Sequence, residues 1–346
     1  MIYTKDLISV IIPMYKIERF IDKCLRSILE QTYTQLEVIA VNDCSPDNTL
    51  SIVQNVASKD KRVKIVDLKK NGGVSNARYE GFLQAAGEYI MFVDGDDFLP
   101  KDAMQTLHNE MLRCNADIVE GGMYRVMDSR GIIKRAFHSS PMMAEHNELM
   151  DKYFISFFGV NILSVALWGK LYKHDLIAQT NAMQPTSFRM GEDLMANLIM
   201  FPVIKRYSRI AAPVYNYRWG GVTSSYNKTL YADLKAQYYL KLKVAEGYKY
   251  GQIYRALKVE MCNVTFSHLV QLMRFGYGRN TAKDFLQSEI DCGFVREITT
   301  GIEYYSLTLE LLKELKIEKL LDLAEKEANS KKWLRWIVKR IASIIN

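Results

Sequence analysis

The sequence predicts an α/β fold with a mostly parallel sheet, followed by a mostly helical C-terminal region. Two observations lead to this prediction. In residues 1–100, short apolar runs of strand type alternate with segments whose apolar residues recur at helical spacing. In residues 231–326 the helical spacing dominates, with breaks near residues 276–278 and 293. Strands that alternate with helices indicate right-handed βαβ crossovers, which place successive strands parallel.

Each expected element rests on its own local pattern. The expected strands of the first part are the apolar runs 7–13, 36–43, 62–68 and 89–94. The expected helices between them are 18–31, 48–58 and 74–87, with Gly87 closing the third helix. Further along are short strands at 116–128 and 131–138, a helix start at 191–201, and a strand from 212 that enters a Gly/Ser/Thr loop. We therefore expect a domain at 1–225 with halves 1–120 and 121–225, a helical region at 226–330, and a terminal segment 331–346.

Composition narrows the class of protein. With 346 residues, 49% of them hydrophobic, the chain can bury a substantial core. The five cysteines are scattered without a CxxC pair, so they indicate neither a disulfide framework nor a zinc ribbon and fit a reducing cytosol. The apolar run before Pro13 is too short for a signal peptide or a membrane span, and no run of 18 apolar residues occurs. We expect a cytoplasmic protein.

The net charge of +7 is concentrated at the C-terminus. Residues 331–346 hold five basic residues and no acid, which leaves +2 for the rest of the chain. A nucleic-acid enzyme would carry a basic stripe across its folded body, so no nucleic-acid partner is expected. On a helical wheel the basic and apolar residues of 331–346 fall in separate arcs, which predicts an amphipathic helix on an anionic membrane, at the inner face of the plasma membrane. A helix docked on the protein is the alternative.

Three acidic residues, Asp94, Asp96 and Asp97, follow an apolar run in the stretch YIMFVDGDDFLP. An Asp-Gly pair alone is typical of a hairpin turn, but a two-residue hairpin does not join parallel strands. In extended backbone Asp94 and Asp96 would point to the same side, roughly 6 to 7 Å apart. Asp43 also ends an expected strand, and ligands gather at the carboxyl ends of parallel strands.

A bound cation is the expected counter-charge for these acids. Carboxylates without a neighbouring Cys or His pattern suit Mg²⁺ or Mn²⁺ rather than zinc, and such ions take phosphate oxygens and water as further ligands. The EF-hand spacing of acidic residues is absent, which excludes a calcium loop of that kind. We therefore expect a divalent cation together with a nucleotide diphosphate.

Four motifs follow one another along the chain: Pro13-Met14-Tyr15, Val41-Asn42-Asp43-Cys44-Ser45-Pro46-Asp47, the stretch NGGVSNARYEG at 71–81, and Asp94-Gly95-Asp96. In this order they resemble the inverting family 2 glycosyltransferases of GT-A fold. The resemblance implies a GT-A, Rossmann-like domain for nucleotide-diphospho-sugar transfer. Asn42, Cys44 and Tyr79 differ from the residues that the family often has there, so the identity of the transferred sugar stays open.

The resemblance also implies a UDP-sugar donor site. Tyr15 would stack on the base and Asp43 would accept the imide N–H of uracil, with a packed ring and a helix cap as the alternatives. Arg78 would contact nucleotide or phosphate, unless it is solvated. Asp94 would touch the ribose or sugar and Asp96 the metal, while Asp97 would support the loop. The nucleotide-sugar-binding set is Pro13, Tyr15, Asp43, Asn71, Gly73, Arg78, Asp94, Gly95 and Asp96, and the metal ligands are Asp96 and Asp94.

A general base is expected in the pair Glu192-Asp193, which opens the stretch EDLMANLIMF. Displacement at an anomeric carbon needs a base that takes the proton of the acceptor hydroxyl. Two acids in a first helical turn also fit a favourable interaction with the helix dipole. The family, however, has an ED motif downstream of D-x-D whose Asp acts as base. The resemblance therefore implies Asp193 as the base, with Glu192 as its alternative or as an acceptor ligand.

Two further segments resemble capsule and lipopolysaccharide enzymes. The stretch LWGKLYKHDLI would place Trp168 and Lys170 near donor or acceptor, and YNYRWGGVTSS contributes Tyr217 and Trp219. Packing in the core is the alternative for the three aromatic rings. The expected acceptor-binding residues are Trp168, Lys170 and Glu192.

Together these features predict an inverting glycosyltransferase of bacterial surface polysaccharide synthesis. It would move a sugar from a UDP-sugar to a hydroxyl of a glycan acceptor, expected to be lipid-linked, with metal-assisted departure of UDP. A sugar nucleotidyltransferase would need a Gly/Arg/Lys-rich loop after the first strand, where PMYKIERFI stands. A dehydrogenase would need G-x-G-x-x-G there. A non-catalytic sugar-nucleotide-binding or scaffold protein of the same fold would be expected to lack Asp96 or the Glu192-Asp193 pair, and all three residues are present.

Overall fold

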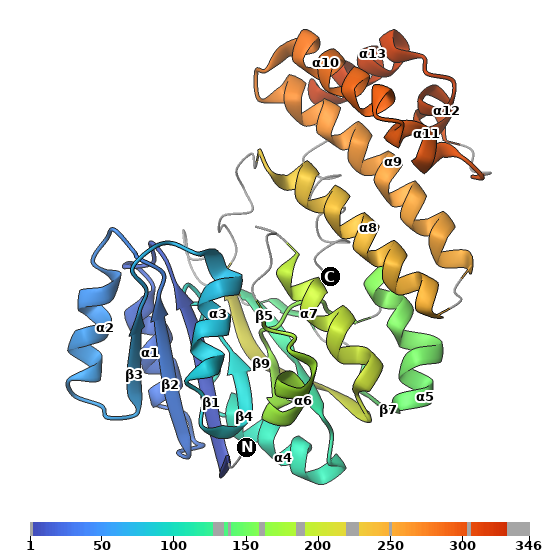
Figure 1. The fold of residues 1–346 in the computed structure, drawn as a ribbon. Coiled ribbons are helices and arrows are strands. Elements are labelled where there is room, and N and C mark those ends of the chain that lie inside the picture. Colours follow the sequence, from blue (N-terminus) through green and yellow to red (C-terminus); the bar gives the residue numbers. More distant parts are fainter. Residues whose placement is uncertain are drawn as a thin grey trace. The chain divides into compact units, whose positions relative to one another are not determined.

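The structure is a computed structural model, and it describes residues 3–126, 135–137, 140–158, 163–184, 191–218, 228–248, 251–302 and 306–330. The chain divides into two compact units. Unit one comprises Met1–Lys152 and Ala166–Ser224, and unit two comprises Tyr153–Val165 and Ser225–Asn346. Figure 1 shows the α/β elements of unit one and the helices of unit two.

The first part of unit one alternates strands and helices as the sequence predicts. Its elements are β1 (Thr4–Met14), α1 (Ile21–Leu29), β2 (Leu36–Asn42), α2 (Thr49–Ala57), β3 (Val63–Asp67), α3 (Gly73–Leu83) and β4 (Gly87–Phe92). Strand β1 pairs in parallel with β2 and with β4, and β2 pairs in parallel with β3. The carboxyl ends of these strands therefore lie at one edge of the sheet, where Asp43 and Asp94 follow β2 and β4.

The second part of unit one extends the same sheet with mixed pairing. Its strands are β5 (Ile118–Val126), β6 (Arg135–Phe137), β7 (Met142–Glu145), β8 (Lys170–Lys173) and β9 (Arg206–Arg218). The strand order among the described residues is β3-β2-β1-β4-β8-β5-β9-β7, with β6 beside β5. Strand β8 is antiparallel to both β4 and β5, whereas β5 and β9 are parallel. This order brings the end of β9 into the region of the β4 end.

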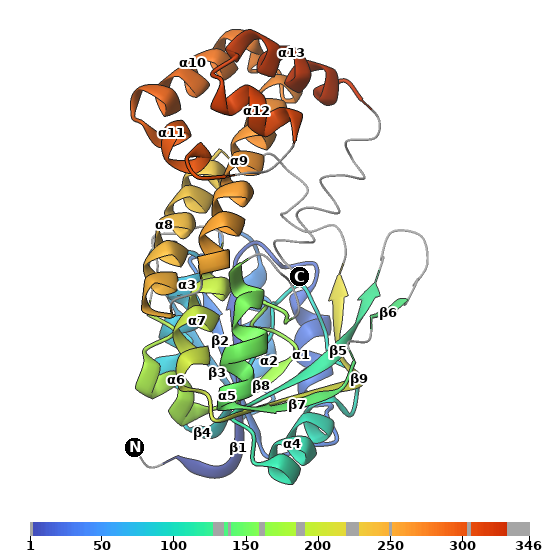
Figure 2. The same cartoon turned by 90° about the vertical axis from the view of Figure 1, so that its right-hand side faces the viewer.

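Helices cover both faces of this sheet. They are the helices of the first part together with α4 (Ala103–Cys114), α6 (His174–Thr180) and α7 (Glu192–Met200). Three shorter helical elements complete this part: α5 (His146–Glu148), the π-turn Leu149–Tyr153 and the 3-10 turn Phe201–Val203. In Figure 2, α3, α6 and α7 lie on one side of the sheet and α4 on the other. The burial of side chains follows the sequence pattern. Every residue of the mostly apolar strand β2 is buried, whereas the amphipathic helix α1 buries only Ile21, Cys24, Leu25 and Ile28. Each buried aliphatic side chain contributes roughly 1.5 to 3 kcal/mol.

The prediction that Gly87 closes a helix is wrong. Helix α3 ends at Leu83, and Gly87 is the first residue of β4. A Cβ at Gly87 would lie 2.4 Å from the carbonyl oxygen of Leu7 and 2.8 Å from Oγ of Ser9. The glycine is therefore required by the close approach of β4 to β1, and not by a helix end.

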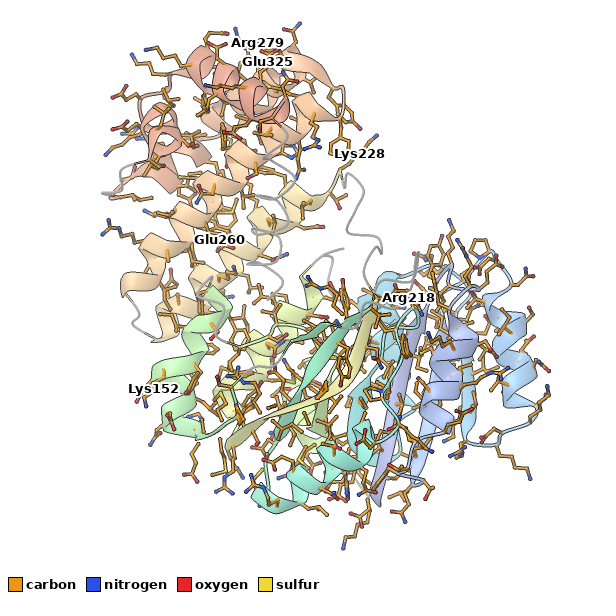
Figure 3. The ribbon with its side chains drawn as sticks, turned by 180° about the vertical axis from the view of Figure 1, so that it is seen from behind. Lys152, Arg218, Lys228, Glu260, Arg279 and Glu325 are labelled. Carbon is orange, nitrogen blue, oxygen red and sulfur yellow. The ribbon has the colours of Figure 1, made fainter. Side chains whose placement is uncertain are left out.

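Unit two is helical where it is described. Its elements are a 3-10 turn (Phe154–Phe158), α8 (Leu230–Tyr248), α9 (Gly251–Arg274), α10 (Gly278–Asp291), α11 (Phe294–Thr299), α12 (Leu307–Lys313) and α13 (Ile317–Ala328). The breaks expected near residues 276–278 and 293 are confirmed, since Gly276, Gly278 and Gly293 have φ of 81°, 83° and 81°. Exposed ion pairs join α10 to α13, where Arg279 contacts Glu318, Asp322 and Glu325 (Figure 3).

Within the described residues, no helix combines the length and the apolar character that crossing a membrane requires. The segment 331–346, for which the sequence predicts an amphipathic helix, lies outside the described residues, and so does the expected Gly/Ser/Thr loop from residue 219 to 225.

Candidate active site

The acid loop, Asp94 to Asp97, directly follows β4 and packs against the end of β1. A Cβ on Gly95 would lie 2.3 Å from Cδ1 of Ile17 and 3.3 Å from the carbonyl oxygen of Pro13. Glycine thus lets the loop backbone approach β1 closely. The structure therefore brings Pro13 and Gly95 together, as two of the residues expected in the donor site.

Strand β9 holds the acid loop from the other side. The N–H of Asp94 donates to Oη of Tyr215 at 3.0 Å, and Oδ1 of Asp97 accepts the backbone N–H of Arg218 at 2.7 Å. Nε of Arg218, which Figure 3 labels, donates to the carbonyl oxygen of Asp96 at 2.7 Å. The Arg218 guanidinium also lies 4.7 Å from the ring centroid of Phe20. Asp97 is 2% exposed and so supports the loop.

The acid loop carries concentrated negative charge. Burial raises the pKa of all three carboxyls, against the opposing charge of Arg78 at Asp94. The charge of Asp94 further raises the pKa of Asp96, and the charges of Asp96 and Asp94 further raise that of Asp97. A cation beside the loop would relieve this repulsion, and carboxylate oxygens are the donors that Mg²⁺ and Mn²⁺ prefer. The residues of the loop therefore fit a divalent ion.

The acid loop alone does not supply all the ligands that a divalent ion needs. Among the described residues, no group of three or more acidic, His or Cys side chains forms a cage that could hold a metal ion. An ion at the acid loop would thus need additional ligands, and Mg²⁺-type ions usually take these from water and substrate phosphates.

Asp43 joins the end of β2 to the start of α3. Its Oδ1 and Oδ2 accept the backbone N–H groups of Gly72 and Gly73 at 2.7 and 2.8 Å. Nδ2 of Asn71 donates to the carbonyl oxygen of Asp43 at 3.2 Å. Gly73 has a φ of 84°, which favours glycine. Asp43 therefore caps α3, and the structure brings Asp43, Asn71 and Gly73 together.

Tyr15 follows β1 and presents an exposed ring. The residue is 42% exposed, and Nζ of Lys16 lies 5.1 Å from the ring centroid. The backbone beside it is fixed, because the N–H groups of Lys16 and Ile17 donate to Oγ of Ser45 and Oγ1 of Thr49. The ring is thus available to a planar ligand at the same edge of the sheet as Asp43.

Arg78 connects the acid loop to the first turn of α7. Its Nη2 contacts Oδ1 of Asp94 at 2.9 Å, and its Nη1 contacts Oδ1 of Asp193 at 2.6 Å and Oε1 of Glu192 at 3.2 Å. The Arg78 side chain is 4% exposed, which excludes the solvated alternative. Oδ2 of Asp193 accepts the backbone N–H of Leu167 at 3.1 Å. Two of the expected donor residues, Arg78 and Asp94, therefore lie in one cluster with the expected base Asp193.

Glu192 and Asp193 differ in their surroundings. Burial and the neighbouring charge of Asp193 raise the pKa of Glu192 to about 7, although Arg78 acts in the opposite direction. The Glu192 side chain keeps one contact with Arg78, at 3.2 Å, and is 16% exposed. A carboxyl with such a pKa can both accept and release a proton near neutral pH.

Lys170 and Trp168 lie on the segment that leads into β8. Lys170 is 1% exposed, with Nζ 3.9 Å from Oε2 of Glu120. Burial lowers the pKa of Lys170, opposed by the charges of Glu120 and Asp193. Lys170 thus has almost no exposed surface for a ligand. Trp168 is partly exposed and stacks on Tyr215 and Tyr217, with ring centroids 4.6 and 5.3 Å apart.

Sequence reasoning missed Tyr215, Arg218 and Leu167 as site residues. Tyr215 and Arg218 hold the acid loop, and Leu167 holds Asp193 through its backbone. All three residues stand in the segments LWGKLYKHDLI and YNYRWGGVTSS, which the sequence analysis singled out. Their contacts could not be predicted, because they join residues far apart in the chain. Trp219, considered as an aromatic of this region, lies outside the described residues.

Comparisons with known proteins bear on the family and the fold of this chain. Residues 9–169 match the family model Glycosyl transferase family 2. The chain is 32% identical over 219 residues to the uncharacterized glycosyltransferase EpsJ of Bacillus subtilis, covering 61% of each chain. It is 29% identical over 214 residues to the poly(ribitol-phosphate) beta-glucosyltransferase of Bacillus spizizenii, covering 61% of this chain and 32% of that protein. The alignments thus span less than two thirds of these relatives.

Solved structures show the same fold. S. aureus TarS 1-349 in complex with UDP-GlcNAc superposes with a TM-score of 0.67 at 21% identity, over 93% of this chain and 91% of that chain. The GT-A fold and the family resemblance expected from the four sequence motifs are confirmed. Residues 9–169 therefore form a glycosyl transferase family 2 domain.

Proposed function

We propose that this protein is an inverting glycosyltransferase that moves a sugar from a UDP-sugar to a hydroxyl of a glycan acceptor. The observation that carries the proposal is the Arg78 cluster, in which one guanidinium contacts Asp94 of the acid loop and Asp193 of α7. Carboxylates suited to a cation and diphosphate thus lie beside a carboxylate suited to proton transfer. The family 2 domain and the names of the relatives support this reading.

The donor would bind along the carboxyl edge of the parallel strands. Tyr15 would stack on the base, and Asn71, Gly73 and Pro13 would shape the site around it. Both oxygens of Asp43 already accept a backbone N–H, so a uracil N–H would use a remaining lone pair. UDP as the nucleotide is supported by the TarS structures, which contain UDP-GlcNAc and UDP.

Asp96 and Asp94 would hold a divalent ion, Mn²⁺ or Mg²⁺. Arg78 contacts Oδ1 of Asp94, and no contact between Arg78 and Oδ2 of Asp94 is found among the described residues. The bound ion would neutralise the charge that develops on the departing diphosphate. Gly95 would keep the loop backbone close to β1, and Asp97 would keep the loop on β9.

Asp193 would act as general base. It would take the proton of the acceptor hydroxyl while the hydroxyl oxygen bonds to the anomeric carbon. The bond from this carbon to the UDP oxygen breaks in the same step, and UDP leaves with the electron pair on the opposite face. The configuration therefore inverts. Glu192, with a pKa near 7, is the alternative base and a ligand for acceptor hydroxyls.

Trp168 would offer its ring to the acceptor sugar, since aromatic faces pack well against apolar faces of ligands. The burial of Lys170 favours a supporting role, in which its charge interacts with Asp193. A relative that is named for poly(ribitol-phosphate) supports a polymer acceptor in bacterial surface polysaccharide synthesis. A lipid-linked acceptor and a site at the inner face of the plasma membrane belong to the same proposal.

The direct test is a donor screen for UDP release. UDP-glucose, UDP-galactose and their N-acetyl forms are incubated with the enzyme, an acceptor preparation and Mn²⁺. We expect release with one of these donors and a product of inverted anomeric configuration. Preference for a GDP- or dTDP-sugar would overturn the uridine assignment, and pyrophosphate release from a nucleoside triphosphate would identify a nucleotidyltransferase.

The role of the base is tested by Asp193→Asn. This variant is expected to bind UDP normally and to lose transfer by roughly 10² to 10⁴, the usual contribution of a general base. Asp175→Asn is a matched control, because Asp175 lies in the first turn of α6 and outside the site. Near-normal transfer by Asp193→Asn would move the role to Glu192 or to another group.

The role of the metal ligand is tested by Asp96→Asn. We expect loss of the Mn²⁺-dependent part of UDP binding, because one carboxylate fewer leaves the ion short of ligands. Titration calorimetry with UDP, in Mn²⁺ and in EDTA, measures this part for wild type and variant. Tight Mn²⁺-dependent binding by the variant would exclude Asp96 as a metal ligand.

A further inference from the structure

Arg78 is a charged residue on the buried face of α3, beside Ala77 and Gly81. Its side chain is 4% exposed. A buried guanidinium is costly unless carboxylates and hydrogen bonds compensate for the lost water. Arg78 can therefore be buried only because it has such partners. Which residues these partners are indicates the function of Arg78.

The partners come from two separate segments of the chain. Asp94 is 16 positions from Arg78, whereas Glu192 and Asp193 are 114 and 115 positions away. Nη2 donates to Asp94, and the two N–H groups of Nη1 are directed to Glu192 and Asp193. A planar guanidinium has the fixed fork geometry that can serve several carboxylates at once, which an ammonium group lacks.

These contacts leave little of Arg78 for a nucleotide. Nε is buried and has no hydrogen-bond partner within the described residues, so a ligand cannot reach it without a rearrangement. A donor phosphate would have to displace a carboxylate to bind Nη1, and the second N–H of Nη2 has little surface to offer because the side chain is only 4% exposed. The contacts of Arg78 therefore indicate that it positions the neighbouring carboxylates.

Asp193 is held at two points. Oδ1 contacts Arg78 at 2.6 Å, and Oδ2 accepts the N–H of Leu167 at 3.1 Å. Leu167 precedes Trp168, the ring considered for the acceptor. The contact with Leu167 thus fixes Asp193 relative to the acceptor segment, and the contact with Arg78 fixes it relative to Asp94 and the donor side.

We propose that Arg78 is a positioning residue, which sets the place of the base Asp193 relative to the donor carboxylate Asp94 and does not bind the nucleotide. The inference rests on the function proposed above. The reaction needs the acceptor oxygen, the anomeric carbon and the leaving group in line, and a small displacement of the base lowers the rate strongly. Loss of the fork should therefore act on turnover and not on nucleotide affinity.

The test compares Arg78→Lys with wild type in UDP affinity and in steady-state kinetics. Lysine keeps the charge and lacks the fork. We expect kcat to fall roughly 10²-fold, as for a misplacement on the order of 1 Å, while the Kd of UDP and the KM of the donor stay within about twofold. A merely structural role would not separate kcat from KM in this way. Equal losses in UDP affinity and kcat would make Arg78 a nucleotide ligand and overturn the inference.

A double-mutant cycle examines whether Arg78 acts through Asp193. In the Asp193→Asn background, Arg78→Lys is expected to cause little further loss of kcat. A full multiplicative loss would show that Arg78 acts by another route. Arg62→Lys is the matched control, because Arg62 also makes a fork, to Asp60, but lies outside the site. A similar fall of kcat in Arg62→Lys would show that the loss in Arg78→Lys comes from lower stability of the fold and not from the position of Asp193.

Two results separate this inference from the proposed function. If the wild-type chain transfers sugar from none of the donors, the proposed function fails before any variant is made. If Arg78→Lys does not fold, a crystal structure of wild type with UDP and Mn²⁺ decides the point. We expect Arg78 to contact Asp94 and Asp193 in that complex, and a hydrogen bond from Arg78 to UDP would overturn the inference.

Discussion

At the residue scale, the acids of the site are held by different kinds of donor. Asp43 and Asp97 accept backbone N–H groups, Asp94 contacts the Arg78 guanidinium, and Asp193 does both. Glu192 has the longest of the three Arg78 contacts. Of the three carboxylates that contact Arg78, ionised Glu192 is therefore the one that the guanidinium stabilises least. This agrees with its raised pKa of about 7.

This pKa predicts how Glu192 affects stability as pH changes. Burial raises the pKa from its ordinary 4.5 to about 7, so the folded state binds the proton more tightly than the unfolded state. The stabilising contribution of protonated Glu192 is then complete below pH 4.5 and is lost as pH rises through about 7. Relative to wild type, Glu192→Gln should gain stability across this window, by an amount that urea unfolding at a series of pH values measures.

Glu110 provides a control of opposite sign. Its contact with Arg113 lowers the pKa of Glu110, which stabilises the folded state when the carboxyl is ionised. Relative to wild type, Glu110→Gln should therefore lose stability as pH rises through the ordinary range of a glutamate. Parallel pH curves for Glu192→Gln and wild type would show that the Glu192 carboxyl titrates normally in the folded chain.

Some of these residue roles follow from the sequence and others do not. Asp43, Asp94 and Asp96 stand where strand-like runs end, so their place at the sheet edge follows from local pattern and from βαβ topology. The partners of Arg78 do not follow, because a helical arginine gives no local sign of a carboxylate 115 positions away. The burial of Lys170 is likewise set by tertiary pairing of β8.

At the element scale, the parallel part of the sheet was predictable because its strands are mostly apolar runs that alternate with helical patterns. Strand β8 was not expected, since KLYK is short and contains two lysines. It is a strand because β4 and β5 pair with it on both sides. Such long-range pairing leaves little trace in a four-residue segment, so the antiparallel insertion into the sheet appears only in the structure.

The close approach of β4 to β1 gives a prediction for Gly87→Ala. The added Cβ would lie 2.4 Å from backbone oxygen of Leu7, so strand backbone has to move. We expect a loss of about 1 to 3 kcal/mol in the free energy of unfolding, the usual effect of overpacking. Gly247→Ala is the control, since no atom lies within 4 Å of its Cβ position in α8. Denaturant unfolding should show no loss there, and an equally mild effect at both sites would refute the steric explanation.

At the scale of the whole molecule, charge is distributed unevenly along the chain. Residues 331–346 contribute five of the seven net positive charges, through basic residues that no acid accompanies. In the part of the chain that the structure describes, no helix is suited to cross a bilayer. The sequence of the segment 331–346 offers both basic and apolar residues, which suits contact with a membrane surface.

We propose that residues 331–346 bind an anionic membrane surface, where a lipid-linked acceptor would be met in two dimensions. Each basic residue near such a surface is worth about 1 kcal/mol, so replacing Lys331, Lys332, Arg335 and Lys339 with Gln should weaken binding roughly a thousandfold. The measurement is sedimentation with anionic liposomes for the full chain, the Gln variant and a chain that ends at residue 330. Neutral liposomes are the control for lipid charge, and UDP binding is the control for an intact fold. Binding that is unchanged by the truncation, or absent from the full chain, would instead assign the segment to contacts within the protein or between subunits.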